Sequence, residues 1–251
     1  MNAAWRMASP RIASMMEAQS DKWARTMVGA ESTADHYYWT TKRAELVTNV
    51  LTLFSRHYPI ETLIHAIMLL DIVGTRSMAQ PPILDTLPYM YTIACVDIAA
   101  KFYETPETRL PLLSTLRLLG EMITHIPDRA QQDTHLQFKV DVLEIEKNIL
   151  SRYLDFNARP YFTSYNFLVE LLPAYNTLAE DILTCLVVSK PELVKSHKPS
   201  DLARLAIAIT EVRLSKAYCI GPACVIPVTA ELMKEVKRWL RCNNIYLCRD
   251  K

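Results

Sequence analysis

The sequence has 251 residues, of which 50% are hydrophobic, which is sufficient for one large or two small hydrophobic cores. Its net charge is +1 and its isoelectric point is near 7.6, so the chain does not have the strong positive charge typical of a dedicated nucleic-acid binder. Only four glycines occur, and no two are close enough to form a Gly-rich phosphate-binding loop, which excludes P-loop and Rossmann nucleotide-binding enzymes.

Signals for secretion or membrane insertion are not evident in the sequence. No run of 18 apolar residues occurs, so we expect no transmembrane span. The N-terminal stretch lacks the apolar core and small-residue cleavage site of a signal peptide. We therefore expect a protein of the nucleus or the cytoplasm, or both, that binds neither membrane nor nucleic acid.

Helical periodicity dominates the sequence. Apolar residues recur at i, i+3 and i+4 along most of the chain, and prolines fall mainly between these runs, which predicts an all-α fold. Residues 1–40 are expected to form an N-terminal arm with one amphipathic helix, which either packs on its own domain or binds a partner. Its predicted apolar face comprises Ile12, Met15, Met16, Trp23 and Met27.

A first helical half is predicted over residues 41–157. Its five helical segments are residues 41–58, 60–73, 83–104, 109–126 and 134–156. The second segment, 60–73, is nearly all apolar and is therefore predicted to be the buried centre. Pro88 falls near the first turns of the third segment, where proline is tolerated.

The helical pattern starts again after the proline-marked joint "NARP", which predicts a second, shorter half over residues 158–251. Its four helical segments are residues 161–172, 175–189, 199–218 and 229–247. Ser200 before an alanine-rich run is typical of a helix N-cap. The basic residues Lys234, Lys237, Arg238 and Arg241 are interpreted as a solvated helix face. The fold prediction is thus about five helices followed by about four.

The cysteines do not indicate a metal site. They are Cys95, Cys185, Cys219, Cys224, Cys242 and Cys248, and the two close pairs are spaced more widely than the knuckles typical of zinc sites. Reduced thiols, buried or idle, are the simpler interpretation, although a metal site is the alternative. We expect no metal and no other cofactor.

Catalytic constellations are also missing from the sequence. No His–Cys, Ser–His or paired-carboxylate arrangement recurs at a meaningful spacing, so we expect a protein without catalytic activity. The alternative is an all-α enzyme with unrecognised chemistry. His65, within the buried segment, is most simply a hydrogen-bonded core histidine.

Two pairs of charged residues interrupt the apolar runs. Asp71 lies among apolar residues and needs a partner if it is buried, and Arg43 is a plausible bidentate one. Alternatively, Asp71 faces water at a helix end. Lys101 and Glu146 would be neighbours if their helices pack together, and from chemistry alone they would form a solvated ion pair of little stabilising effect.

Several of these segments resemble a cyclin box in their order and character. They are "KRAELV" (42–47), "ETLIHAIMLLD" (61–71), "IAAKFYE" (98–104), "LEIEKNIL" (143–150) and "LDFNARPYFTSYNFL" (154–168), with "PSDLARLAIAI" similar to the third helix of a second box. The resemblance covers roughly residues 40–220. It implies two tandem cyclin-like helical halves, the second one shortened, and Arg43–Asp71 as an internal brace.

The resemblance also implies a function. In cyclins the lysine and the glutamate of these motifs grip mobile elements of a cyclin-dependent protein kinase, the class of enzyme that drives the cell cycle. By this carry-over the kinase-binding residues of a heterodimer are Lys101, Phe102, Glu146, Ile149, Leu150 and Phe156. The chain would then be a regulatory subunit that activates a serine/threonine kinase. The alternative is a cyclin-fold adaptor in transcription or signalling that activates no kinase.

The sequence departs from cell-cycle cyclins in two respects. Where cyclins with a substrate-docking groove carry an apolar residue and a tryptophan, this chain has Glu45 and Asn49, so we expect no such groove. The stretch between Lys101 and Glu146 is longer than is usual in cyclins, and the excess is placed in the connection between the fourth and fifth predicted helices.

Overall fold

The computed structural model describes residues 14–22, 37–78, 80, 87–120, 131–156, 162–172 and 176–214. These described residues form helices and contain no strand, which confirms the all-α prediction. None of their helices is both long enough and apolar enough to cross a membrane. The chain divides into two compact units, Ala30–Pro160, and Met1–Gly29 together with Tyr161–Lys251. Each unit is described separately below.

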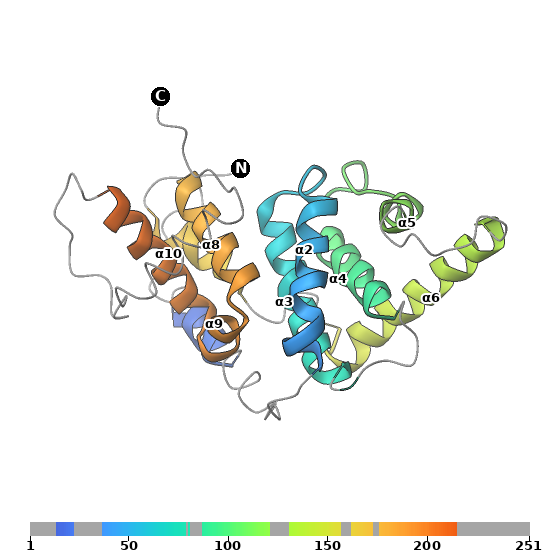
Figure 1. Ribbon diagram of the computed structural model, residues 1–251, viewed down its shortest axis with the longest axis horizontal. Helices are drawn as coiled ribbons and strands as arrows, with labels where there is room; N and C mark the ends of the chain where they lie inside the picture. Colours follow the sequence, from blue (N-terminus) through green and yellow to red (C-terminus); the bar gives the residue numbers. More distant parts are fainter. Residues whose placement is uncertain are drawn as a thin grey trace. The chain divides into compact units, whose positions relative to one another are not determined.

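The 30–160 unit is a bundle of helices around one central helix (Figure 1). A π-helical turn, η2 (Tyr38–Lys42), leads directly into α2 (Arg43–Phe54), and α3 (Ile60–Ser77), α4 (Leu87–Tyr103), α5 (Leu112–Gly120) and α6 (Gln131–Arg152) follow. The central helix α3 packs against α2 and α4, and α4 also contacts α6. Thus α4 connects the core of this unit to α6.

The helix α3 is the most deeply buried element of this unit. Every residue from Thr62 to Gly74 is buried, because apolar side chains surround the whole circumference of the helix. This confirms the prediction that residues 60–73 form a buried centre. Pro88 is the second residue of α4, within the first turn. A backbone N–H at this position has no acceptor within the helix, so its absence in proline costs no hydrogen bond.

The second unit contains the helix of residues 14–22 and four helices from the C-terminal part of the chain. These are α7 (Ser164–Leu171), α8 (Thr177–Ser189), α9 (Pro191–Ser196) and α10 (Pro199–Leu214), and α10 packs against both α7 and α8. Local signals fix the helix starts: Thr163 and Asn166 form a capping box, and Asn176 caps α8. Pro191 is the first residue of α9, a position that favours proline.

The structure corrects three sequence predictions in the second unit. Ser200 is not an N-cap, because α10 begins at Pro199 and the Ser200 hydroxyl bonds to Ser20 and Glu17 instead. In the helix of residues 14–22, Met16 is buried but Met15 is exposed, so the predicted apolar face is wrong at Met15. The short helix α9 was not predicted as a separate element.

Some predictions concern residues outside the described part of the chain. They are the positions Ile12, Trp23 and Met27, the segment 229–247 with its basic residues Lys234, Lys237, Arg238 and Arg241, and the cysteines Cys219, Cys224, Cys242 and Cys248.

The predicted helix 134–156 ends at Arg152 instead, because the backbone of Asp155 and Phe156 takes positive φ angles of 51° and 56°.

Candidate partner-binding surface

Arg43 and Asp71 form a buried ion pair between the first residue of α2 and the middle of α3. The guanidinium donates two hydrogen bonds to the carboxylate, Nε to Oδ1 at 2.7 Å and Nη2 to Oδ2 at 2.9 Å. Both side chains are only 1% exposed. Of the two readings left open by the sequence, the structure has the bidentate pair, because the carboxylate does not face water.

Two aromatic residues of η2 complete this brace, and sequence reasoning missed both. The Tyr38 hydroxyl donates to Asp71 at 2.6 Å, and the Trp39 ring lies 5.2 Å from the Arg43 guanidinium carbon. Burial, followed by the Asp71 carboxylate, raises the pKa of Tyr38, which keeps its hydroxyl protonated as a donor. A π-helical turn has no sequence signature here that would have placed these rings beside the pair.

Lys101, in the last turn of α4, is held between two carboxylates. Its ammonium pairs with Asp97 at 2.7 Å, one turn earlier on α4, and with Glu146 on α6. The Lys101 side chain is 40% exposed, whereas that of Glu146 is only 8% exposed. Lys101 and Glu146 were predicted to be neighbours, and they form an ion pair. The i,i+4 spacing of Asp97 and Lys101 was the sequence signal that could have predicted the additional contact of Lys101 with Asp97.

The two charges of this pair are stabilised unequally. Burial acts to lower the pKa of Lys101, but hydrogen bonds to Asp97 and Glu146 outweigh it and the pKa is raised. For Glu146, burial is the largest effect and raises the pKa, and its bond to Lys101 only partly opposes this. The fold thus holds this carboxylate where burial disfavours its charged form, a feature that is found at functional sites and also in structural ion pairs.

Phe102 follows Lys101 and lies partly in solvent, with 44% of its area exposed. Two aromatic rings support it edge-on: Tyr103, at a centroid distance of 4.9 Å, and the fully buried His65 of α3, at 5.8 Å. His65 is therefore a core residue, and its contact with Phe102 orients an exposed aromatic side chain.

A stripe on α6 continues this surface. Leu143, Glu146 and Leu150 are spaced three and four residues apart, so they lie along one side of the helix. Leu143 is exposed and was missed by the sequence reasoning, and Leu150 is half-buried. Ile149 is fully buried in the core, so its assignment as a contact residue is corrected, because it has no surface to offer a partner.

Phe156 presents an exposed ring from an unfavourable backbone conformation. It is 72% exposed, has a φ of 56°, and its N–H donates to the Leu150 carbonyl at 2.7 Å. A left-handed conformation costs roughly 1–2 kcal/mol for a residue with a Cβ. A solvated phenylalanine held at this position is better explained by a role in binding than by stability. We call Lys101, Phe102, Leu143, Glu146, Leu150 and Phe156 the Lys101 surface.

The described residues offer no metal-binding cluster of three or more His, Cys, Asp or Glu side chains. The two cysteines in this part of the chain are buried. Burial raises the pKa of Cys95, and it raises that of Cys185 to about 12. Both thiols are therefore protonated at neutral pH and are poor nucleophiles and metal ligands.

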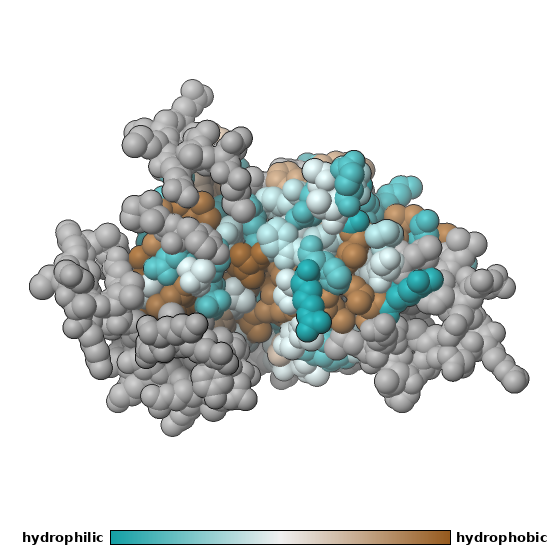
Figure 2. All heavy atoms as spheres, turned by 90° about the horizontal axis from the view of Figure 1, so that it is seen from above, coloured by the Kyte–Doolittle hydropathy of each residue, from teal (hydrophilic) through white to brown (hydrophobic). Residues whose placement is uncertain are grey.

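Apolar side chains reach the surface elsewhere as well. On the face drawn in Figure 2, brown apolar atoms lie in small groups among polar ones over the described residues. Among the residues that the structure describes, the large exposed hydrophobic ones are Met15, Phe102, Val140, Leu143, Phe156, Val169 and Leu171. Three of these belong to the Lys101 surface, which makes it a mixed apolar and charged patch.

Comparison with known proteins adds no family to this description. No protein-family model matches the chain, and no relative was found among curated proteins. The function is therefore inferred from the chemistry of the Lys101 surface.

Proposed function

We propose that this chain is a cyclin-type regulatory subunit that binds and activates a cyclin-dependent serine/threonine kinase through the Lys101 surface. In this proposal the two compact units correspond to two tandem cyclin-like halves, the second one shortened. The chain itself carries no catalytic residue and takes no cofactor. The kinase partner is a nuclear or cytoplasmic enzyme, and the pair is a heterodimer.

One observation carries the proposal: a half-exposed ammonium and a nearly buried carboxylate are fixed beside an exposed aromatic ring. When a partner covers this surface and expels water, the Lys101 ammonium can donate to backbone carbonyls and the Glu146 carboxylate can accept from backbone N–H groups. Phe102 supplies the apolar anchor typical of an interface hot spot. These groups suit a partner that offers both polar backbone and an apolar pocket.

The helices that carry the surface are joined by packing and hydrogen bonds, and a surface formed before binding lowers the entropic cost of association. The Arg43–Asp71 brace joins α2 to α3, and α3 packs along α4, which ends at Lys101 and Phe102. At the other side of the surface, the Ser77 hydroxyl of α3 donates to the Tyr153 hydroxyl at 2.6 Å, just beyond the end of α6. The brace and this contact support a preformed surface.

Activation of the kinase is a shift between two conformations. Moving such an equilibrium from 1:99 to 99:1 requires about 5.5 kcal/mol of preferential binding to the active state. An interface of roughly 1,600 Å² can provide this preference if its central contacts are made only in the active conformation.

The experiment that tests this proposal measures binding of the full chain to a panel of purified cyclin-dependent kinases. We expect one kinase to bind, and Lys101→Glu or Phe102→Ala to weaken its binding by about tenfold or more. Arg56→Glu, at an exposed cation in the same unit, is the matched control and leaves the affinity unchanged. If no kinase of the panel binds, the adaptor function takes precedence.

A further inference from the structure

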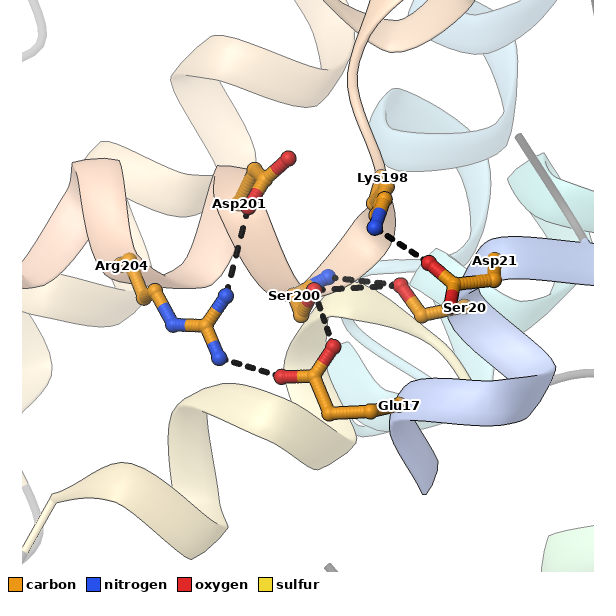
Figure 3. A network of polar contacts seen from close by, with 7 residues as sticks. All are labelled: Glu17, Ser20, Asp21, Lys198, Ser200, Asp201 and Arg204. Atoms are coloured by element: carbon orange, nitrogen blue, oxygen red, sulfur yellow. Dashed lines mark hydrogen bonds and ion pairs between the residues drawn. The ribbon is translucent and has the colours of Figure 1, made fainter. Parts of the chain in front are cut away.

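The helix of residues 14–22 lies against the N-terminal end of α10 in the same compact unit (Figure 3). Its buried side chains, Met16 and Ser20, are one turn apart and face inward together. Glu17 and Asp21 are also one turn apart and lie beside this buried face. The short helix thus presents one serine and two carboxylates to the start of α10 and the residue before it, and it buries one methionine.

The carboxylates of Glu17 and Asp21 contact two cations and a hydroxyl at the start of α10. Glu17 pairs with the Arg204 guanidinium and accepts a hydrogen bond from the Ser200 hydroxyl at 3.1 Å. Asp21 pairs with Lys198, and this hydrogen bond is the largest of the effects that raise the pKa of Lys198. Asp201 holds the other end of the Arg204 guanidinium at 3.3 Å.

The serine between the carboxylates fixes the register of the contact. The Ser20 hydroxyl donates to the Ser200 hydroxyl at 3.2 Å and accepts from the Ser200 N–H at 3.3 Å. Both serine side chains are fully buried. A helix shifted by one residue would lose these bonds and separate both carboxylates from their cations, so the surface is selective for this spacing.

The docked helix is held by contacts that are individually weak. The paired side chains are each about one-third to one-half exposed, so each pair stabilises the contact only weakly and is screened by salt. A helix as short as residues 14–22 is also marginal by itself in water. Its release and return are therefore expected to be frequent.

We propose that Lys198, Ser200 and Arg204 form a recognition site for an acidic helix. Residues 14–22 of the same chain occupy this site, and an acidic helix of a partner protein displaces them. The partner helix carries two carboxylates one turn apart, a serine or similarly small donor just before the second, and an apolar residue one position before the first. Charge complementarity selects it, and the contacts of Glu17, Ser20 and Asp21 define its pattern.

The test uses the full chain and a fluorescent peptide with the sequence of residues 10–26 as the acidic helix. Glu17→Lys/Asp21→Lys in the chain vacates the site by repulsion from Arg204 and Lys198. Anisotropy is expected to show that this variant binds the peptide, with an affinity that falls steeply as salt rises. The wild-type chain is expected to bind about 10- to 100-fold more weakly, because its own helix competes at a high effective concentration.

Two controls keep the result interpretable. A peptide with Glu17→Gln and Asp21→Gln should bind at least tenfold more weakly to the vacated chain. A chain with Arg204→Glu/Asp21→Lys keeps the site vacant, because Glu17 then faces the new carboxylate at position 204 and the new ammonium at position 21 faces Lys198. This chain should not bind the acidic peptide but should bind a peptide that carries Glu17→Lys, which shows that the site is still folded. Equal binding of the acidic peptide and the peptide with Glu17→Gln and Asp21→Gln would overturn the proposal. Failure of the wild-type chain to bind the acidic peptide at any concentration would overturn it as well.

Discussion

At the residue scale, two of the ion pairs in the 30–160 unit differ in character. The Arg43–Asp71 pair is buried on both sides and saturated with hydrogen bonds, which is how a structural pair avoids an uncompensated charge. The Lys101–Glu146 pair is half-open, and burial disfavours its carboxylate. The first pair is suited to holding helices together, whereas the second is suited to binding.

Removal of one charge from the buried pair should be costly. We expect Asp71→Asn to lower the free energy of unfolding by about 3–5 kcal/mol, because Arg43 is left as an uncompensated buried charge. The double variant Arg43→Met/Asp71→Asn should recover part of this loss. Urea denaturation of both variants measures the difference, and a double variant that is no more stable than Asp71→Asn would contradict the brace.

The conformation of Phe156 predicts opposite effects on stability and binding. Phe156→Gly should raise the free energy of unfolding by about 1 kcal/mol, since glycine adopts a positive φ without a Cβ clash. The same change should weaken binding to the kinase partner. Denaturation and binding assays on one preparation test both, and a loss of stability would show that the ring contributes to packing instead.

The raised pKa of Glu146 predicts a pH-dependent stability difference. A carboxyl group whose pKa is raised on folding contributes stability below about pH 4.5, and this contribution is lost as pH rises through its folded pKa. The melting temperature of Glu146→Gln relative to wild type should therefore increase between about pH 4.5 and pH 7.5. The raised pKa of Lys101 acts only above about pH 10.5, outside this window.

The exposed Glu144 on the same helix provides the control for this measurement. Glu144→Gln removes the same charge from α6 without touching Lys101. A melting-temperature difference for Glu146→Gln that is flat or declining over this pH range would show that burial does not disfavour the carboxylate.

At the scale of elements, the contact between η2 and α3 depends on a single glycine. A Cβ at Gly74 would collide with the ring of Tyr38, which is fully buried and fixed by its bond to Asp71. The π-helical turn can therefore approach α3 only where the side chain is absent. Gly74 thus permits the aromatic part of the brace.

Gly74→Ala should be destabilising although alanine is the better helix former. The propensity gain of about 1 kcal/mol is expected to be exceeded by an overpacking cost of roughly 1–3 kcal/mol at Tyr38. A lower melting temperature for Gly74→Ala, and a smaller decrease when Tyr38→Leu is also present, would support this contact. If Gly74→Ala raises the melting temperature, the close packing of η2 on α3 is incorrect.

The elements also show which features were predictable from the sequence. Helix α3 was predictable because burial on all sides leaves a nearly continuous apolar run, and the position of Pro88 in the first turn of α4 follows a local rule. The ends of other helices were not, because tertiary contacts decide them. Ser200 bonds to a helix distant in sequence rather than capping its own, and α6 ends at residues in an unusual conformation.

The candidate surface was predictable in part for the same reasons. Lys101 and Glu146 were expected to meet, and they do, since each lies at the edge of an apolar stripe on packed helices. Ile149 was assigned to this surface through the resemblance to cyclins and not from periodicity, whereas in the structure Ile149 is buried and Leu150 is half-buried. The roles of Tyr38 and Trp39 could not be predicted, because they depend on a π-helical turn that helix propensity does not indicate.

At the scale of the whole molecule, the two compact units have different proposed tasks. The 30–160 unit carries the Lys101 surface, and the other unit carries the acidic-helix site at the start of α10. The two proposals depend on separate residues, so either can fail without the other. The kinase-regulator proposal is the central one, since it concerns what the whole chain does.

The most direct test is the rate at which a purified cyclin-dependent kinase phosphorylates a peptide substrate with and without the full chain. With the kinase that binds the chain most tightly, we predict an increase of tenfold or more at saturation. Lys101→Glu and Phe102→Ala should shift the half-maximal concentration upward, whereas Arg56→Glu should not. An unchanged rate at saturating wild-type chain would contradict the account, because binding without activation is the behaviour of an adaptor.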